Sequence, residues 1–327
     1  MKLYDKFFEP ITDLDKKGFF ADKLLTGKVT FTKKKADSKK NETCKLIHKS
    51  QLENDKDGKL SHFGEGQVEA ECDCGKLNMT FSEKKFSVEG NNKSEMNLHG
   101  HKQPYNVGMK FELPFDKVEN QMGNIFFKLN GIRLFTQDTY NHSEQIKVEC
   151  TRGNFPKPTI EVMGLNHFKN FYIGKIVKFN TSLAPMFPLC EAMIGFKNAN
   201  FQAYAKYAIE NLQFLGKPTL GLYATRFCEK NKVKFEVGGE GSFDLKKKTA
   251  TDPIEFNPAG FLAVKMTGDD HGFQMKYDVK NVLTTAFFVK PMKELKLTVS
   301  DCFNCLNLFK DQKSLGYRYG FGAEWEI

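Results

Sequence analysis

The strongest constraint on this chain is an alternation of apolar and polar residues that continues from about residue 28 to residue 327. A period of two is typical of β-strands that present one apolar and one polar face. The clearest case is residues 317–327, in which the odd positions are aromatic or aliphatic and the even positions are Arg, Gly or Glu. Short polar turns, such as 89–93 and 268–272, separate the segments. The sequence therefore predicts one all-β domain without a linker.

Composition excludes several classes of protein. The chain has 327 residues, of which 32 are Phe, and this aromatic content excludes a disordered tail. It contains no run of ~20 apolar residues, so no membrane-spanning helix is expected. The net charge is +9, but only four residues are Arg, whereas nucleic-acid readers depend on Arg. We therefore expect a diffuse positive potential and no nucleic-acid partner.

Two architectures fit the alternation. A soluble β-sandwich buries its apolar rows between two sheets, whereas a membrane β-barrel turns them to lipid and keeps its polar rows inside. Three observations favour the barrel: the strands follow one another closely, full charges occur in nearly every polar row, and the sequence given ends in a strand. The soluble β-sandwich, as a binding protein, stays as an alternative.

The N-terminal segment has a different period. Residues 3–17 predict an amphipathic helix with Leu3, Phe7, Ile11 and Leu14 on one side. Pro10 lies within this span, so we expect a kink or two short turns. Residues 1–6 lack the apolar segment that a secretory signal peptide contains, so we expect no such signal. A frayed surface helix is the simplest interpretation of the pattern alone.

Motifs for catalysis or cofactors are missing from the sequence. There is no nucleophile elbow, P-loop or HExxH motif, so we expect no enzyme and no cofactor. The pairs Cys72/Cys74 and Cys302/Cys305 do not make a convincing zinc framework, and Cys72 lies in an apolar row. We therefore expect no metal site.

Four motifs together resemble the mitochondrial voltage-dependent anion channel family, the eukaryotic porins. The first is residues 13–20, which resemble the end of the family's N-terminal amphipathic segment and its Lys-Gly-aromatic junction. The others are Met-Thr-Phe-Ser-Glu-Lys at 79–84, Gly-Met-Lys-Phe at 108–111, and the closing segments 290–291, 295–300 and 319–325. The order and spacing follow the family at both ends of the chain, and the middle matches only in strand character.

This resemblance implies a transmembrane antiparallel β-barrel of about 19 strands, with residues 1–27 as a helix and connector inside the pore and residues 28–327 as the barrel. It implies a passive voltage-gated channel for anions and small metabolites such as nucleotides across the mitochondrial outer membrane. Expected partners are membrane lipids, the barrel-assembly machinery, permeating nucleotides, and a homo-oligomer or larger mitochondrial complex. Two related alternatives are the protein-import channel of that membrane and a non-conducting, porin-like structural subunit.

Individual residues follow from the alternation and the resemblance together. Basic residues that occupy the polar positions of a strand are predicted to face the lumen. The resemblance implies that Lys110 contributes to anion passage, as the corresponding lysine of the family does. Glu83 continues an apolar row and corresponds to the family's bilayer-facing acid, although it could equally lie at the rim. The C-terminal pattern resembles the sorting signal of outer-membrane barrels, with Gly320, Gly322, Trp325 and Ile327. The predicted pore-lining set is Lys16, Lys17, Lys28, Gly108, Lys110, Lys147, Lys234, Lys276, Lys296 and Arg318.

Overall fold

In the part of the chain that the computed structural model describes, the α-helix α1 (Tyr4–Lys16) is followed by β-strands. Within the described ranges, no helix is long and apolar enough to cross a membrane. The residues that the structure describes are 4–16, 25–34, 43–54, 60–72, 75–82, 85–98, 101–114, 124–137, 140–150, 159–180, 189–210, 215–246, 253–307 and 318–326.

Within the described residues, nineteen strands make up a single sheet. The 3-10 helices η2 (Glu229–Asn231) and η3 (Cys305–Asn307) follow β13 and β18. The strands are β1 (Leu25–Lys34), β2 (Thr43–Asn54), β3 (Leu60–Cys72), β4 (Gly75–Ser82), β5 (Lys85–Leu98), β6 (His101–Pro114), β7 (Asn124–Gln137), β8 (Tyr140–Cys150), β9 (Thr159–Phe168), β10 (Phe171–Asn180), β11 (Leu189–Lys197), β12 (Phe201–Glu210), β13 (Lys217–Cys228), β14 (Val233–Lys246), β15 (Glu255–Thr267), β16 (His271–Asp278), β17 (Val282–Met292), β18 (Leu295–Asn304) and β19 (Arg318–Glu326).

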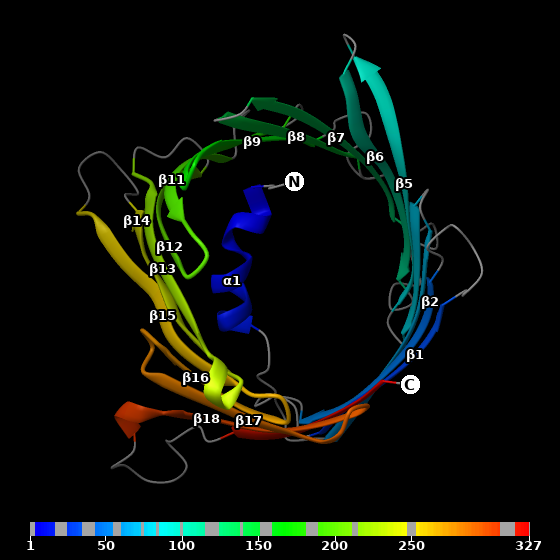
Figure 1. The fold of residues 1–327 in the computed structure, drawn as a ribbon, viewed down its shortest axis with the longest axis vertical. Coiled ribbons are helices and arrows are strands. Elements are labelled where there is room, and N and C mark those ends of the chain that lie inside the picture. The colour runs from blue at the N-terminus through cyan, green and yellow to red at the C-terminus, as the bar shows by residue number, and fades with distance from the viewer. Residues whose placement is uncertain are drawn as a thin grey trace.

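The sheet closes on itself. Each strand pairs antiparallel with the next, and β1 also pairs with β19 in parallel, with Leu25 opposite Phe321 and Thr30 opposite Glu326. Parallel closure follows from the odd number of strands, because the first and last strands of an up-and-down meander then run in the same direction. The ring is visible in Figure 1. The predicted all-β barrel is confirmed, and the two-sheet sandwich is not the architecture.

The helix lies inside this ring, on the side of β11 to β15 and away from β1 to β7 (Figure 1). It forms one element through Pro10, so the expected division into two short turns was wrong. Its position inside the ring also corrects the interpretation as a surface helix. The first strand begins at Leu25, slightly before the boundary expected at residue 28.

Strand register divides the side chains into an inner and an outer set. Residues directly opposite each other in neighbouring strands share a face, and successive residues alternate between faces. Tyr172 and Tyr204 contact the helix and therefore mark the inner face. Following the register around the ring assigns the apolar rows predicted from sequence, such as Leu77 with Phe81 and Tyr319 with Phe321, to the outer face.

Large apolar side chains cover the outer face. Many expose 40% or more of their surface, although such residues are normally buried in water-soluble domains. Among the described side chains they occur on strands between β1 and β4 and between β8 and β19, including Phe31, Leu46, Phe81, Ile146, Phe171, Ile173, Ile194, Leu220, Leu222, Phe235, Val237, Leu262, Phe287, Val299, Phe321 and Trp325. The fold is therefore inverted relative to a soluble protein, with its apolar surface outside and its polar rows inside.

Candidate functional site

One face of the helix is packed against the inner wall of the barrel. Tyr4, Phe7, Ile11 and Leu14 are each at most 3% exposed, and their spacing places them along one side of α1. The wall contributes its own apolar residues to this contact, namely Met163, Leu165, Tyr172, Met193, Tyr204, Tyr223 and Ala263. The main hydrophobic core of the described chain is thus the joint between helix and barrel.

Glycines on the inner wall make room for the helix. A Cβ atom added to Gly174 would lie 2.4 Å from the Tyr4 ring, and one added to Gly195 would lie 2.6 Å from the Phe7 ring. A Cβ on Gly238 would lie 2.9 Å from the Leu222 carbonyl oxygen and 3.0 Å from the Leu14 side chain. A larger residue at Gly174 or Gly195 would push an aromatic ring of the helix away from the wall, so these two glycines set the depth at which the helix docks.

Wall side chains also bind the helix backbone. Gln202 donates from Nε2 to the Phe7 carbonyl oxygen at 2.6 Å, and Gln274 donates to the Leu14 carbonyl oxygen at 2.9 Å. The second contact lies in the last helical turn, where carbonyls have no partner within the helix. A barrel side chain therefore satisfies a group that the helix cannot satisfy itself.

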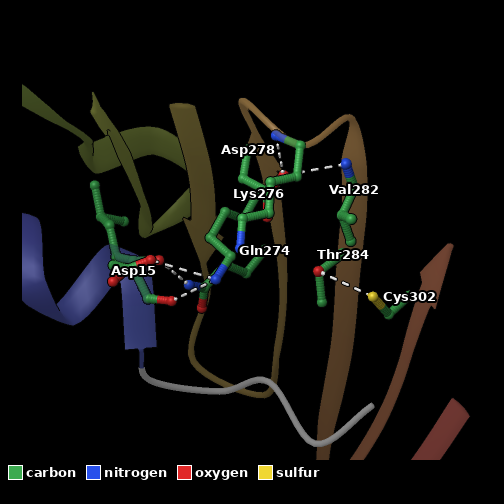
Figure 2. Close-up of polar contacts among 9 residues, drawn as sticks. Asp15, Gln274, Lys276, Asp278, Val282, Thr284 and Cys302 are labelled. Carbon is green, nitrogen blue, oxygen red and sulfur yellow. Dashed lines mark hydrogen bonds and ion pairs between the residues drawn. The ribbon is translucent and has the colours of Figure 1, made fainter. Parts of the chain in front are cut away.

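Charged and phenolic groups complete the contact at both helix ends. The Tyr4 hydroxyl donates to Glu191 Oε1 at 2.5 Å. At the other end, Lys276 Nζ lies 3.1 Å from the Asp15 carbonyl oxygen and 3.3 Å from its carboxylate (Figure 2). A positive group at a helix C-terminus also interacts favourably with the helix dipole.

Aromatic rings and lysines surround the first half of the helix. The ring centroids of Phe8 and Tyr204 are 4.8 Å apart in an edge-to-face arrangement. Lys206 Nζ lies 5.1 Å from the centroid of Phe8, and Lys197 Nζ lies 5.7 Å from the centroid of Phe7. These cation–π contacts hold two wall lysines against the helix instead of leaving them free in the lumen.

Carboxylates on the inner wall offset several of its positive charges. On β14, Glu236 accepts a hydrogen bond from Tyr223 at 2.6 Å and forms an ion pair with Lys234 at 2.8 Å. Glu240 accepts a hydrogen bond from Tyr204. The wall on this side therefore contains a network of phenol, carboxylate and ammonium groups.

Four of the predicted pore-lining residues have described contacts on the inner face. Lys234 pairs with Glu236, Lys276 contacts the helix, and Lys296 lies 3.2 Å from Glu324. Arg318 contacts the sulfur of the buried Cys302, which also accepts a hydrogen bond from Thr284 at 3.6 Å (Figure 2). The described contacts of these four residues are therefore with the wall and the helix.

Lys28 differs from that group. Its register partners are Glu324 on β19 and Lys49 on β2, which places it on the inner face at the closing seam. It borders a hollow of about 420 Å³ that is also lined by Thr26, Lys49, Phe63 and Glu65. Among the described residues, Lys28 has no hydrogen-bond or ion-pair partner. Its charge is therefore not offset by a carboxylate among the described residues.

Other predicted residues are only partly described. Gly108 and Lys110 lie on β6 and Lys147 on β8, in register with inward positions, and nothing is described of these side chains. Lys16 ends the helix and is exposed. Gly320, Gly322 and Trp325 lie on β19, with the glycines buried on the inner side and Trp325 exposed outside. Lys17, Glu83 and Ile327 lie outside the described residues.

Sequence reasoning missed the residues that dock the helix. Gln202, Gln274 and Tyr204 belong to polar rows and resemble ordinary lumen residues. A usable signal was present in the glycines, because Gly174 and Gly195 interrupt neighbouring strands at inner positions. Small residues at matched inner positions indicate that another backbone or ring approaches closely.

Comparison with known proteins does not identify the family of this chain. No known protein family matches the chain, and no curated protein matches it either. The resemblance of its motifs to the eukaryotic porins therefore stays a hypothesis.

Proposed function

We propose that the chain is a membrane-embedded channel of the eukaryotic porin type, which lets anions and small metabolites diffuse passively across the mitochondrial outer membrane. The observation that carries this proposal is a closed ring of nineteen strands with an apolar outer face and a charged inner face. A closed barrel satisfies every backbone group between neighbouring strands, which is the requirement for crossing a bilayer without helices.

The strand number supports this family over a bacterial type of barrel. Bacterial single-chain barrels have even strand numbers, whereas the mitochondrial channel has 19. The parallel β1–β19 seam, with Lys28 opposite Glu324, is the feature that an odd number requires. Together with the four sequence motifs, this favours the mitochondrial outer membrane as the location.

The placement of the helix supports a conducting pore. The helix is held on the β9 to β16 side by Gln202, Gln274 and Lys276, while β1 to β7 form the opposite side of the ring (Figure 1). An off-centre helix leaves the far side of the lumen for permeants. Because Lys234 and Lys296 are paired with carboxylates, we propose only weak anion selectivity.

The tight contact between helix and wall favours a second candidate, a barrel that does not conduct and serves as a structural subunit. Both candidates predict the same membrane insertion, so insertion alone does not separate them. Ion flow does separate them, because a plugged lumen passes no current at any voltage.

Refolded protein in a planar bilayer with a salt gradient tests the proposal. We expect large, weakly anion-selective current steps that close as voltage rises. Carbonate extraction in parallel establishes that the protein is in the membrane. Inserted protein without current would refute the channel and support the structural subunit, and protein that is extracted by carbonate would refute the membrane barrel itself.

A further inference from the structure

The hairpin formed by β14 and β15 extends beyond the strands on either side of it. In the described residues, β13 pairs with β14 only as far as Ser242, and β16 pairs with β15 only as far as Phe261. Residues 243–246 and 255–259 pair with each other, and the described sheet contains no other pairing for them. We call these two segments the projecting hairpin.

The projecting hairpin leaves the wall of the barrel. Figure 1 shows this end of β14 and β15, in yellow, outside the ring that the neighbouring strands form. Residues 255–259 are all exposed, whichever face of the strand they occupy. At about 3.3 Å per residue, this segment is roughly 17 Å long. The hairpin therefore leans away from the rim and does not simply add height to the wall.

Glycines lie at the base, where the hairpin departs from the wall. A Cβ added to Gly239 would lie 2.4 Å from the Phe261 carbonyl oxygen, and one added to Gly260 would lie 2.5 Å from the Glu240 carbonyl oxygen. The two backbones therefore approach each other closely on the outer face, which glycine allows. A hollow of about 590 Å³ lies beside these glycines, and the leucines that border it are Leu220, Leu222 and Leu262. The outer face is thus concave at the base of the hairpin, as an outward bend requires.

The face of the projecting hairpin that continues the outer wall is apolar. Phe243 lies opposite Pro258, and Leu245 lies opposite Phe256. Because side chains alternate along a strand, Phe256 and Pro258 share the outward face of Leu262. Phe243 exposes 53% of its surface and Phe256 exposes 65%. The apolar rows of the outer wall therefore continue onto the hairpin.

The opposite face of the projecting hairpin is polar. Asp244 lies opposite Asn257, and Lys246 lies opposite Glu255. These positions continue the charged rows of the inner wall beyond the barrel. One apolar face and one charged face on the same short element are typical of amphipathic segments that lie in the plane of a membrane interface.

The direction of the lean decides what the apolar face meets. The rim on this side is marked by Lys217, the first residue of β13, and Asp278, the last residue of β16. Beside it, the Tyr277 hydroxyl donates to Asn281 Oδ1 at 2.5 Å, an arrangement that suits a tyrosine at a membrane–water interface. A wall segment that bends outward at the rim turns its outer face towards the membrane and its inner face towards water. The apolar face of the hairpin therefore meets the lipid surface.

We propose that the projecting hairpin is an interfacial anchor that lies on the bilayer surface, with Phe243 and Phe256 in the boundary between headgroups and acyl chains. Amphipathic surface segments reach about 5–10 Å into this boundary. The inference rests on the proposed function, because it requires a barrel that is embedded in a membrane. Strand pairing with another protein is the competing interpretation of the free edges. Pro258 has no N–H to donate to such a strand, and edge pairing would leave the apolar face uncovered.

Tryptophan fluorescence with brominated lipids tests the position of the hairpin. The full-length barrel carries Trp325→Phe, which removes its single native tryptophan, and is refolded into phosphatidylcholine vesicles with bromine either near the headgroup or deep in the acyl chain. Phe256→Trp reports the apolar face, and Asn257→Trp, the next residue along the strand, reports the polar face. Leu262→Trp is the reference on the wall, because Leu262 is 69% exposed on the outer face. All of these side chains are exposed, so the substitutions keep the packing of the barrel.

The outcomes separate this inference from the proposed function. We expect Phe256→Trp to lose emission to lipid bromine, more to bromine near the headgroup than to deep bromine, whereas Asn257→Trp loses emission only to acrylamide in the water. Bromine quenching of Leu262→Trp without Phe256→Trp overturns the anchor and leaves the embedded barrel intact. Quenching of neither overturns the embedded barrel as well. Emission of Phe256→Trp that is shielded from both bromine and acrylamide overturns the anchor in favour of a protein that covers the hairpin.

Discussion

The most direct test of the helix joint is the substitution Ile11→Ala. Ile11 is 2% exposed and lies between the barrel wall and the helix axis. Truncation of a fully buried Ile to Ala costs about 2–5 kcal/mol through lost burial and the cavity left behind. The helix makes this contact only when it is docked, so the cost falls on the equilibrium between docked and released helix.

The expected size of the effect follows from that cost. Each 1.4 kcal/mol changes an equilibrium tenfold, so docking should weaken by about 30-fold to 3,000-fold. Hydrogen–deuterium exchange of the peptide that covers residues 4–16, measured in the folded barrel, reports this opening directly. Exchange of those amides should accelerate by the same factor, while the strand amides keep their protection.

A matched control is present on the same helix. Thr12 is exposed, so Thr12→Ala removes a side chain without removing wall contacts, and its exchange should match the wild type. If Ile11→Ala accelerates exchange less than about threefold, the burial of the apolar helix face does not hold the helix in place. Docking would then depend on the hydrogen bonds from the wall.

Three further predictions address other parts of the inner wall. Gly195→Val should displace the Phe7 ring and release the helix, which is measured as faster exchange of residues 4–16. Gln274→Leu leaves the Leu14 carbonyl without its partner and should weaken docking by about 1–3 kcal/mol, with the faster exchange confined to the last helical turn. Lys28→Glu should move the reversal potential in a salt gradient towards cation preference, because it replaces a positive charge on the inner face with a negative one.

The architecture was predictable because it depends on a property that each strand carries by itself. In β19, Tyr319, Phe321 and Trp325 alternate with Gly320 and Gly322, and this pattern alone assigns an outer and an inner face. The strand number and the closing pair were not contained in the alternation. They depend on the register between distant strands, and the resemblance to a family supplied the expected number.

The helix shows where a local pattern stops being sufficient. The buried positions Phe7, Ile11 and Leu14 were expected on one side, and they are the side that docks. Pro10 predicted a kink or two short turns, but the chain forms one helical element through it. The helix is held by wall contacts such as the bond from Gln202 to the Phe7 carbonyl, and the local sequence of the helix does not contain these contacts.

The roles of individual site residues were harder to predict, because a position on the inner face does not specify what a side chain contacts. Lys276 and Lys234 were both expected to serve anion passage, yet one contacts the helix end and the other pairs with Glu236. Which lysine is free depends on the carboxylates that neighbouring strands place beside it. Lys28 on β1 lies opposite another lysine, Lys49 on β2, so this neighbour does not neutralise its charge.

Departures from the alternation carry more information than the alternation itself. On β9 to β11, the inner rows contain Met163, Leu165 and Met193, which are apolar residues where a water-filled lumen would favour polar ones. An apolar inner row is stable only if something covers it, and the amphipathic helix has the matching face. In this barrel, the apolar residues on the inner face therefore indicate the element that lies against them.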